Sequence, residues 1–95
     1  MTTNNTNDYA KKQAMARKLE GAAFTSRIDH NAFDAASEAI FRVLSKIEKL
    51  DCFAAQVAQT VNKTCGHGYR AASISSKQAW ILACAAVENG IEWVD

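Results

Sequence analysis

The most regular pattern of hydrophobic and polar positions lies in the middle of the chain. Apolar side chains recur there at the three- and four-residue spacing of one face of an amphipathic helix: Phe33, Ala36, Ile40, Val43, Ile47 and Leu50. The same register continues through Ala54, Val57 and Val61 without a glycine or a proline. This segment is the strongest helix prediction in the sequence.

Two interpretations of the central segment remain open at this point. One is a single helix over residues 31–62, capped by Asp29 or Asn31. The other is a break near Leu50, where Asp51 would cap a second helix. We favour the break, because a helix longer than about 25 residues is unusual in so small a domain.

The ends of the chain give weaker patterns. Residues 1–7 are threonine- and asparagine-rich after the initial methionine, which predicts a disordered tail. A first helix is expected from Asp8 to Glu20, with Gly21 as its stop and a sparse apolar stripe of Tyr9, Ala16, Leu19 and Ala23.

The final helix has clear start and stop signals. Ser75 and Gln78 have the spacing of a capping box, and Gly90 stands where a left-handed residue would end the helix before Ile91. Its predicted apolar face consists of Trp80, Ile81, Cys84 and Val87. Together these elements predict an all-α fold, a small bundle of three to four helices forming a single domain over residues 8–95.

Composition narrows the class of protein without selecting a function. The chain has 95 residues, a net charge of +1 and 48% apolar residues, which suits one globular domain and gives no general affinity for nucleic acid. No apolar run is long enough for a membrane span, and the first residues lack the apolar core of a secretory signal. We therefore expect a cytoplasmic protein without a membrane partner, whose three cysteines are free thiols.

The segment between Cys52 and Val87 contains no acidic residue. Its cations gather around a glycine-containing loop and the start of the last helix, where unpaired backbone N–H groups favour anions. The simpler interpretation, which we favour, is a capped helix behind a polar loop. The candidate partner- or anion-binding residues are Lys63, His67, Tyr69, Arg70, Ser75, Ser76, Lys77 and Gln78.

Two further groups are candidates for a binding surface. A second set of cations on the first helix forms either a solvated face or a secondary basic face for nucleic acid: Lys11, Lys12, Arg17 and Lys18. Phe41 and Phe53 lie beside the main apolar stripe. The helix that carries them is therefore either central in the bundle or partly covered by a partner or a second copy.

No catalytic set is evident. Cys65 and His67 lie two residues apart, but no neighbouring acid is available to orient the imidazole, and zinc would need four ligands. We therefore expect that the protein is not an enzyme and binds neither a cofactor nor a metal ion.

The leading hypothesis is a non-enzymatic binding or regulatory protein that docks on another macromolecule, most readily a protein. One form of it is a phage- or plasmid-type inhibitor of a host complex. The alternative is a nucleic-acid-binding helical domain that uses the basic loop and the N-terminus of the last helix, where Gln78 would be placed to read adenine. A homo-oligomer is compatible with either hypothesis.

Overall fold

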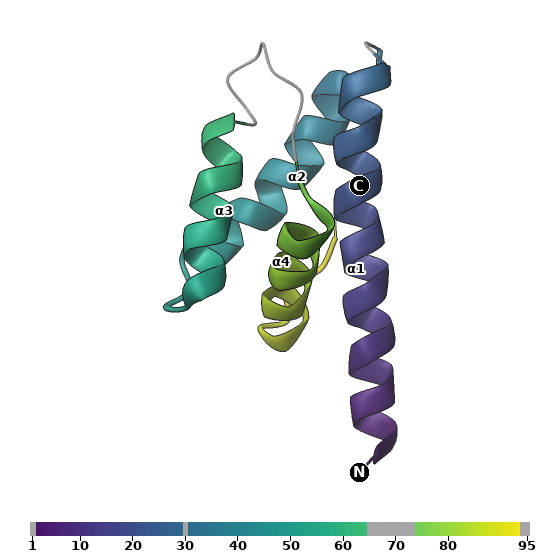
Figure 1. Ribbon diagram of the computed structural model, residues 1–95, viewed down its shortest axis with the longest axis vertical. Helices are drawn as coiled ribbons and strands as arrows, with labels where there is room; N and C mark the ends of the chain where they lie inside the picture. The colour runs from purple at the N-terminus through teal and green to yellow at the C-terminus, as the bar shows by residue number, and fades with distance from the viewer. Residues whose placement is uncertain (1, 30, 65–73, 94–95) are drawn as a thin grey trace.

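The computed structural model describes residues 2–29, 31–64 and 74–93, which form four helices and no strand (Figure 1). The helices are α1 (Thr2–Ile28), α2 (Phe33–Ile47), α3 (Phe53–Thr64) and α4 (Ser76–Glu88). The prediction of a small all-α bundle is confirmed. None of the described helices is both long enough and apolar enough to cross a membrane.

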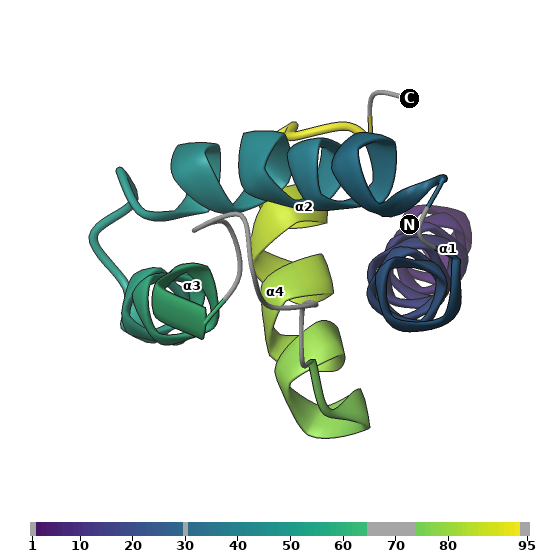
Figure 2. The ribbon, with the colours of Figure 1, turned by 90° about the horizontal axis from the view of Figure 1, so that it is seen from above.

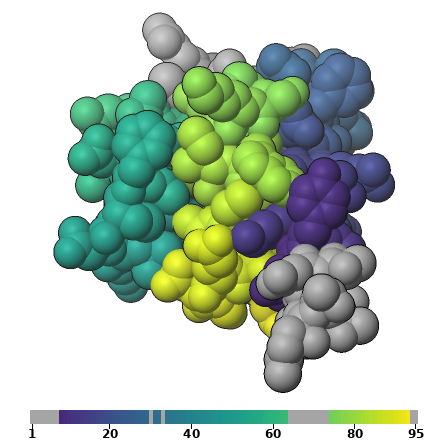
Figure 3. Space-filling model, turned by 60° about the horizontal axis from the view of Figure 1, so that its bottom comes forward, coloured from purple at the N-terminus to yellow at the C-terminus, as the bar shows by residue number. Residues whose placement is uncertain are grey.

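The helices are arranged around α4. In Figure 2, α1 and α3 lie on either side of α4, and α2 crosses above all three. Figure 3 shows from another side that α4 and the segment after it separate α1 from α3. Each helix contributes apolar side chains to one core, the largest of which are Leu19, Ile40, Leu44, Ile47 and Leu82. Burial of these side chains supplies the main driving force for the fold.

The central segment is broken, as we favoured. Helix α2 ends at Ile47 and α3 begins at Phe53. The break closes into a hairpin, in which the Asn62 amide donates a 2.8 Å hydrogen bond to Glu48 across the two helices.

The predicted caps of these two helices are wrong in detail. The residue before α3 is Cys52, whose carbonyl accepts from the Ala55 N–H, so Asp51 lies one position too early to cap it. The N-cap of α2 is Ala32, which makes no side-chain cap bond. Asp29 instead accepts from the backbone N–H of Asn31, in a turn that precedes the helix.

Helix α1 is longer than predicted. It continues through Gly21 to Ile28, so the prediction that Gly21 stops it is wrong. A glycine in a helix interior costs only about 1 kcal/mol relative to alanine, and Ala23 and Ser26, both buried, hold the following turns in place. Residues 2–7, which lie in the predicted disordered tail, are assigned to the first turns of α1 and extend past the end of α4 (Figure 1).

The ends of α4 are confirmed. Ser75 accepts from the Gln78 N–H, and the Gln78 side chain accepts from the Ser75 N–H, which completes the capping box. Gly90 has a φ of +71°, and Ile91 N–H donates to the Ala86 carbonyl at 2.8 Å. This is the Schellman arrangement, with Ile91 packed against the core.

The predicted apolar face of α4 is right only in part, since Ile81 and Val87 pack against the core but are only partly buried. Its buried residues are Ala79, Leu82, Ala83, Ala85 and Ala86, whereas Trp80 is partly exposed at the edge facing α1. Helix α4 lies between α1 and α3 and packs most extensively against α1. Four of its five buried residues are alanines, which allow close approach of the neighbouring helices, and Leu82 is the one large side chain among them.

Candidate functional site

Phe41 is the centre of the surface that best fits a binding site. Its ring is 51% exposed on α2, although apolar residues on the same helix are fully buried. Two shallow pockets meet at this side chain, one of about 430 Å³ and one of about 350 Å³. We call the basic and aromatic residues that line them the Phe41 surface: Phe41, Arg42, Lys46, Lys49 and Lys63.

The charges on this surface are mostly unneutralised. Arg42 forms an ion pair with Glu38 one turn earlier, at 2.9 Å. Within the described part of the chain, no carboxylate lies at ion-pair distance from Lys46, Lys49 or Lys63. Three lysines that lack an ion-pair partner among the described residues therefore line the two pockets next to a half-exposed aromatic ring.

Acidic groups are present at the edges of the two pockets but are fewer. Glu48 lines the pocket beside Lys63, and one of its carboxylate oxygens accepts from Asn62 at 2.8 Å. Glu92, from the chain after α4, lines the pocket beside Lys46. The surface is thus mixed in charge with an excess of cations, a composition typical of the polar rim around an aromatic anchor.

The structure brings together candidates that are far apart in sequence. Phe41 was predicted as a possible apolar contact and Lys63 as a partner-binding residue, and both line the same pocket. Lys46 and Lys49 were not singled out by the sequence analysis. Their signal was available, because Arg42, Lys46 and Lys49 follow one another at four and three residues, the spacing of a single helical face.

Phe53 does not join this surface. It is 63% exposed at the first position of α3, but it lines neither pocket next to Phe41. The sequence left open whether the helix that carries Phe41 is central in the bundle or partly covered by a partner or a second copy. In the structure α4 lies in the middle, and α2 and α3 each present an aromatic side chain to solvent (Figure 2).

The start of α4 carries four other candidates, and most of their polar groups are engaged. Ser75 and Gln78 satisfy each other in the capping box. Ser76 donates from its hydroxyl to Glu20 of α1 at 2.7 Å, while Lys77 is exposed. A carboxylate of the chain itself therefore lies beside this helix N-terminus, where an external anion was considered. His67, Tyr69 and Arg70 lie outside the described residues.

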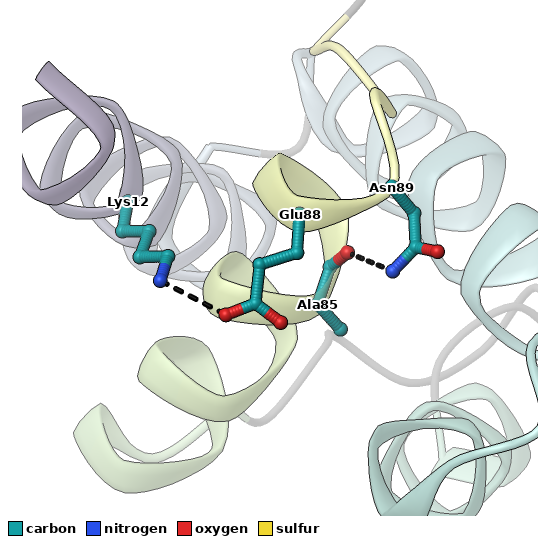
Figure 4. A network of polar contacts seen from close by, with 4 residues as sticks. All are labelled: Lys12, Ala85, Glu88 and Asn89. Atoms are coloured by element: carbon teal, nitrogen blue, oxygen red, sulfur yellow. Dashed lines mark hydrogen bonds and ion pairs between the residues drawn. The ribbon is translucent and has the colours of Figure 1, made fainter. Parts of the chain in front are cut away.

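The cations of α1 do not share one face. Lys11 and Lys18 line a groove of about 370 Å³ beside Ile91 and Trp93, whereas Arg17 lines a different pocket next to Trp80. Lys12 lies between these two sides and forms a 3.0 Å ion pair with Glu88 of α4 (Figure 4). These cations therefore lie on different sides of α1, and their role as a secondary basic face for nucleic acid stays a prediction.

The environment of Lys12 changes its ionisation. Its hydrogen bond to Glu88 raises the pKa of the ammonium group above the ordinary value. In the same region, burial raises the pKa of the Cys84 thiol, which favours its protonated form. Figure 4 also shows Asn89 donating to the Ala85 carbonyl, at 2.8 Å, which satisfies a carbonyl near the end of α4.

Metal ligands and thiols form no cluster among the residues that are described. No group of three or more His, Cys, Asp or Glu side chains there could hold a metal ion. Cys52 is exposed in the connection between α2 and α3, whereas Cys84 is partly buried in α4. Cys65 and His67, the pair weighed for thiol chemistry, fall outside the described residues.

Comparisons with known proteins add no further constraint: no family model, no curated protein and no solved structure matches this chain. The Phe41 surface is therefore the basis for the function proposed next.

Proposed function

We propose that this chain is a cytoplasmic, non-enzymatic binding protein that docks on another protein through the Phe41 surface. Its partner would offer an apolar recess for the Phe41 ring and carboxylates for Lys46, Lys49 and Lys63. In this proposal the chain would act as a regulator or inhibitor of the protein on which it docks. The single observation behind it is a half-exposed phenylalanine beside three lysines that have no ion-pair partner in the described part of the chain.

The energetics favour such a role for this residue. Aromatic anchors that enter a desolvated pocket contribute about 2 kcal/mol or more to protein complexes, while charged rim residues mainly accelerate association. Nothing in the fold requires Phe41 to be aromatic, because the fully buried residues of α2 are Ile40, Val43, Leu44 and Ile47. Phe41 is therefore free to serve a partner rather than the core.

A protein partner is favoured over nucleic acid for two reasons. Glu48 and Glu92 line the same two pockets and would repel a phosphate backbone. At the start of α4, Ser76 is bonded to Glu20 and Gln78 is held in the capping box, so neither is poised to contact a base or a phosphate. The net charge of +1 also argues for a weak electrostatic contribution.

The test is affinity capture from a lysate of the native cell, with and without nuclease. The wild-type chain is compared with Phe41→Ala and with Lys46→Glu, and Phe53→Ala is the matched control, since Phe53 is an exposed aromatic residue outside the surface. We expect a nuclease-resistant protein that is lost with the first two variants, by about 30-fold in affinity for Phe41→Ala. Capture that is unchanged by Phe41→Ala, or abolished by nuclease, would refute the proposal.

A further inference from the structure

The solvent side of α1 carries a second helical stripe, separate from the one that packs in the core. Its six residues are all exposed and follow a 4-3-4-3-4 spacing, the spacing of a coiled-coil seam: Ala10, Ala14, Arg17, Gly21, Phe24 and Ile28. The core-facing stripe of the same helix contains Met15, Leu19 and Ala23. We call the exposed residues the outer seam.

None of the four described helices covers the outer seam. Helix α1 lies at one edge of the bundle, with α2 and α4 against its inner side (Figures 1 and 2). Phe24 is 54% exposed and Ile28 is 65% exposed. The guanidinium of Arg27 lies over the Phe24 ring at 5.9 Å, so this ring is held at the surface and not folded into the core.

The order of side-chain sizes along the outer seam indicates which partner packs against it. Small residues, Ala10 and Ala14, occupy the first half, and bulky residues, Phe24 and Ile28, occupy the second half. The spacing is the same in both directions, with its midpoint at Leu19. An antiparallel copy of the same helix therefore places each bulky residue opposite a small one: Phe24 faces Ala14 and Ile28 faces Ala10.

The two residues beside the midpoint fit the same register. Arg17 of one copy faces the partner's Gly21, where the absence of a side chain leaves room for the guanidinium. It also comes within reach of the partner's Glu20. Within one copy Glu20 accepts from Ser76 through Oε1, and its second carboxylate oxygen is available for Arg17. Because the arrangement is two-fold symmetric, this charge pair forms twice.

We propose that the outer seam of α1 is a homodimer interface, in which two copies pair antiparallel about Leu19 over a length of about 27 Å. This interface is distinct from the Phe41 surface, which lies on α2 and α3. A dimer would therefore present two Phe41 surfaces, and neither proposal depends on the other.

The first test is cysteine pairing in a background that lacks the native thiols (Cys52→Ser, Cys65→Ser, Cys84→Ala). Ala14→Cys and Phe24→Cys are prepared as separate proteins and then mixed under mild oxidation. In the proposed register Cα atoms at 14 and 24 of opposite copies are level, whereas two copies of position 14 are about 15 Å apart, beyond disulfide reach. We expect covalent dimers in the mixture and none in either protein alone. A disulfide dimer of Ala14→Cys alone, or none in the mixture, would overturn the proposal.

The second test is sedimentation analysis over about a hundredfold range of protein concentration. The unaltered chain is expected to show a concentration-dependent monomer–dimer equilibrium. Gly21→Gln is expected to shift the dissociation constant at least tenfold towards monomer. A Cβ added at this position meets no neighbouring heavy atom within 4 Å in the single chain, and Gly21 is exposed, so the substitution does not disturb the core.

Phe24→Glu is expected to do the same, and Phe53→Glu is its matched control on α3. A monomeric unaltered chain, unchanged dimerisation of Gly21→Gln, or equal loss with Phe53→Glu would each reject the outer seam as the interface. In the last case the outer seam would be covered by another protein or by another face of the bundle.

Discussion

Gly21 and Gly90 permit a paired experiment, because the same substitution should have opposite effects at the two positions. A methyl group added at either glycine meets no heavy atom within 4 Å, so neither variant is limited by space. Gly21 lies inside α1, where alanine is favoured over glycine by about 0.5–1 kcal/mol. Gly90 has a φ of +71°, a left-handed conformation that costs an L-residue about 1–2 kcal/mol.

The expected result is therefore a stabilised Gly21→Ala and a destabilised Gly90→Ala. For a domain of this size 1 kcal/mol corresponds to a change in Tm of about 4–8 °C, so Tm should rise by about 2–8 °C in the first variant and fall by about 4–16 °C in the second. Urea titration monitored by circular dichroism supplies the matching free energies of unfolding.

The measurements should be made at two protein concentrations, because Gly21 also belongs to the outer seam and a dimer would add to the stability. Destabilisation by Gly21→Ala in the dilute sample would show that α1 does not continue through this residue. A neutral Gly90→Ala would show that the end of α4 lacks its left-handed residue.

Three further predictions concern the core, a cap and an ion pair. Leu82→Ala should lower the free energy of unfolding by about 2–5 kcal/mol, since Leu82 is fully buried in the central helix; a loss below about 1 kcal/mol in urea titration would contradict that placement. Ser75→Ala should cost about 0.5–2 kcal/mol through loss of the capping box, whereas Ser75→Asp should retain most of the stability, and equal losses in both would count against the cap. Stability should also decline in alkaline solution, because the pKa of Lys12 is raised by Glu88 and that of Cys84 by burial. The stabilisation from Lys12 is complete below its ordinary pKa of 10.5 and is lost as pH rises through the raised value. The urea midpoint of Lys12→Met should therefore fall less steeply with pH in alkaline solution than that of the unaltered chain. An identical pH dependence in the two proteins would refute the assignment.

The parts of the fold that depend on neighbouring residues were predictable from the sequence. The capping box of Ser75 and Gln78 and the left-handed Gly90 are determined within a few residues, and both are present. Local signals failed where a weak preference competed with tertiary packing. At Gly21 the stop signal was outweighed by the contacts of the turns that follow it.

The buried face of α4 was not predictable from a hydrophobic pattern. The buried residues of α4 are four alanines and Leu82, and alanines contribute little to a hydrophobic pattern. The larger residues Trp80, Ile81 and Cys84 therefore indicated a neighbouring side of the helix. Only the positions of the other helices resolve this ambiguity.

The candidate site was partly predictable, one residue at a time. Phe41 was conspicuous because the buried stripe of its helix was already complete without it, and Lys63 because of its acid-free surroundings. Their proximity depends on the hairpin between α2 and α3, which the sequence left as one of two alternatives. The cations of α1 show the opposite case: they are close in sequence, but the helical turn places them on different sides of the helix.

The most direct test of the proposed function is amide hydrogen exchange of this chain with and without the protein recovered by affinity capture. Slower exchange is expected over residues 41–49, in α2 and directly after it, and at the α3 end that carries Lys63, with exchange in α1 unchanged by the partner. Protection confined to α1 or to the start of α4, with none around Phe41, would contradict the proposal that the chain docks through the Phe41 surface.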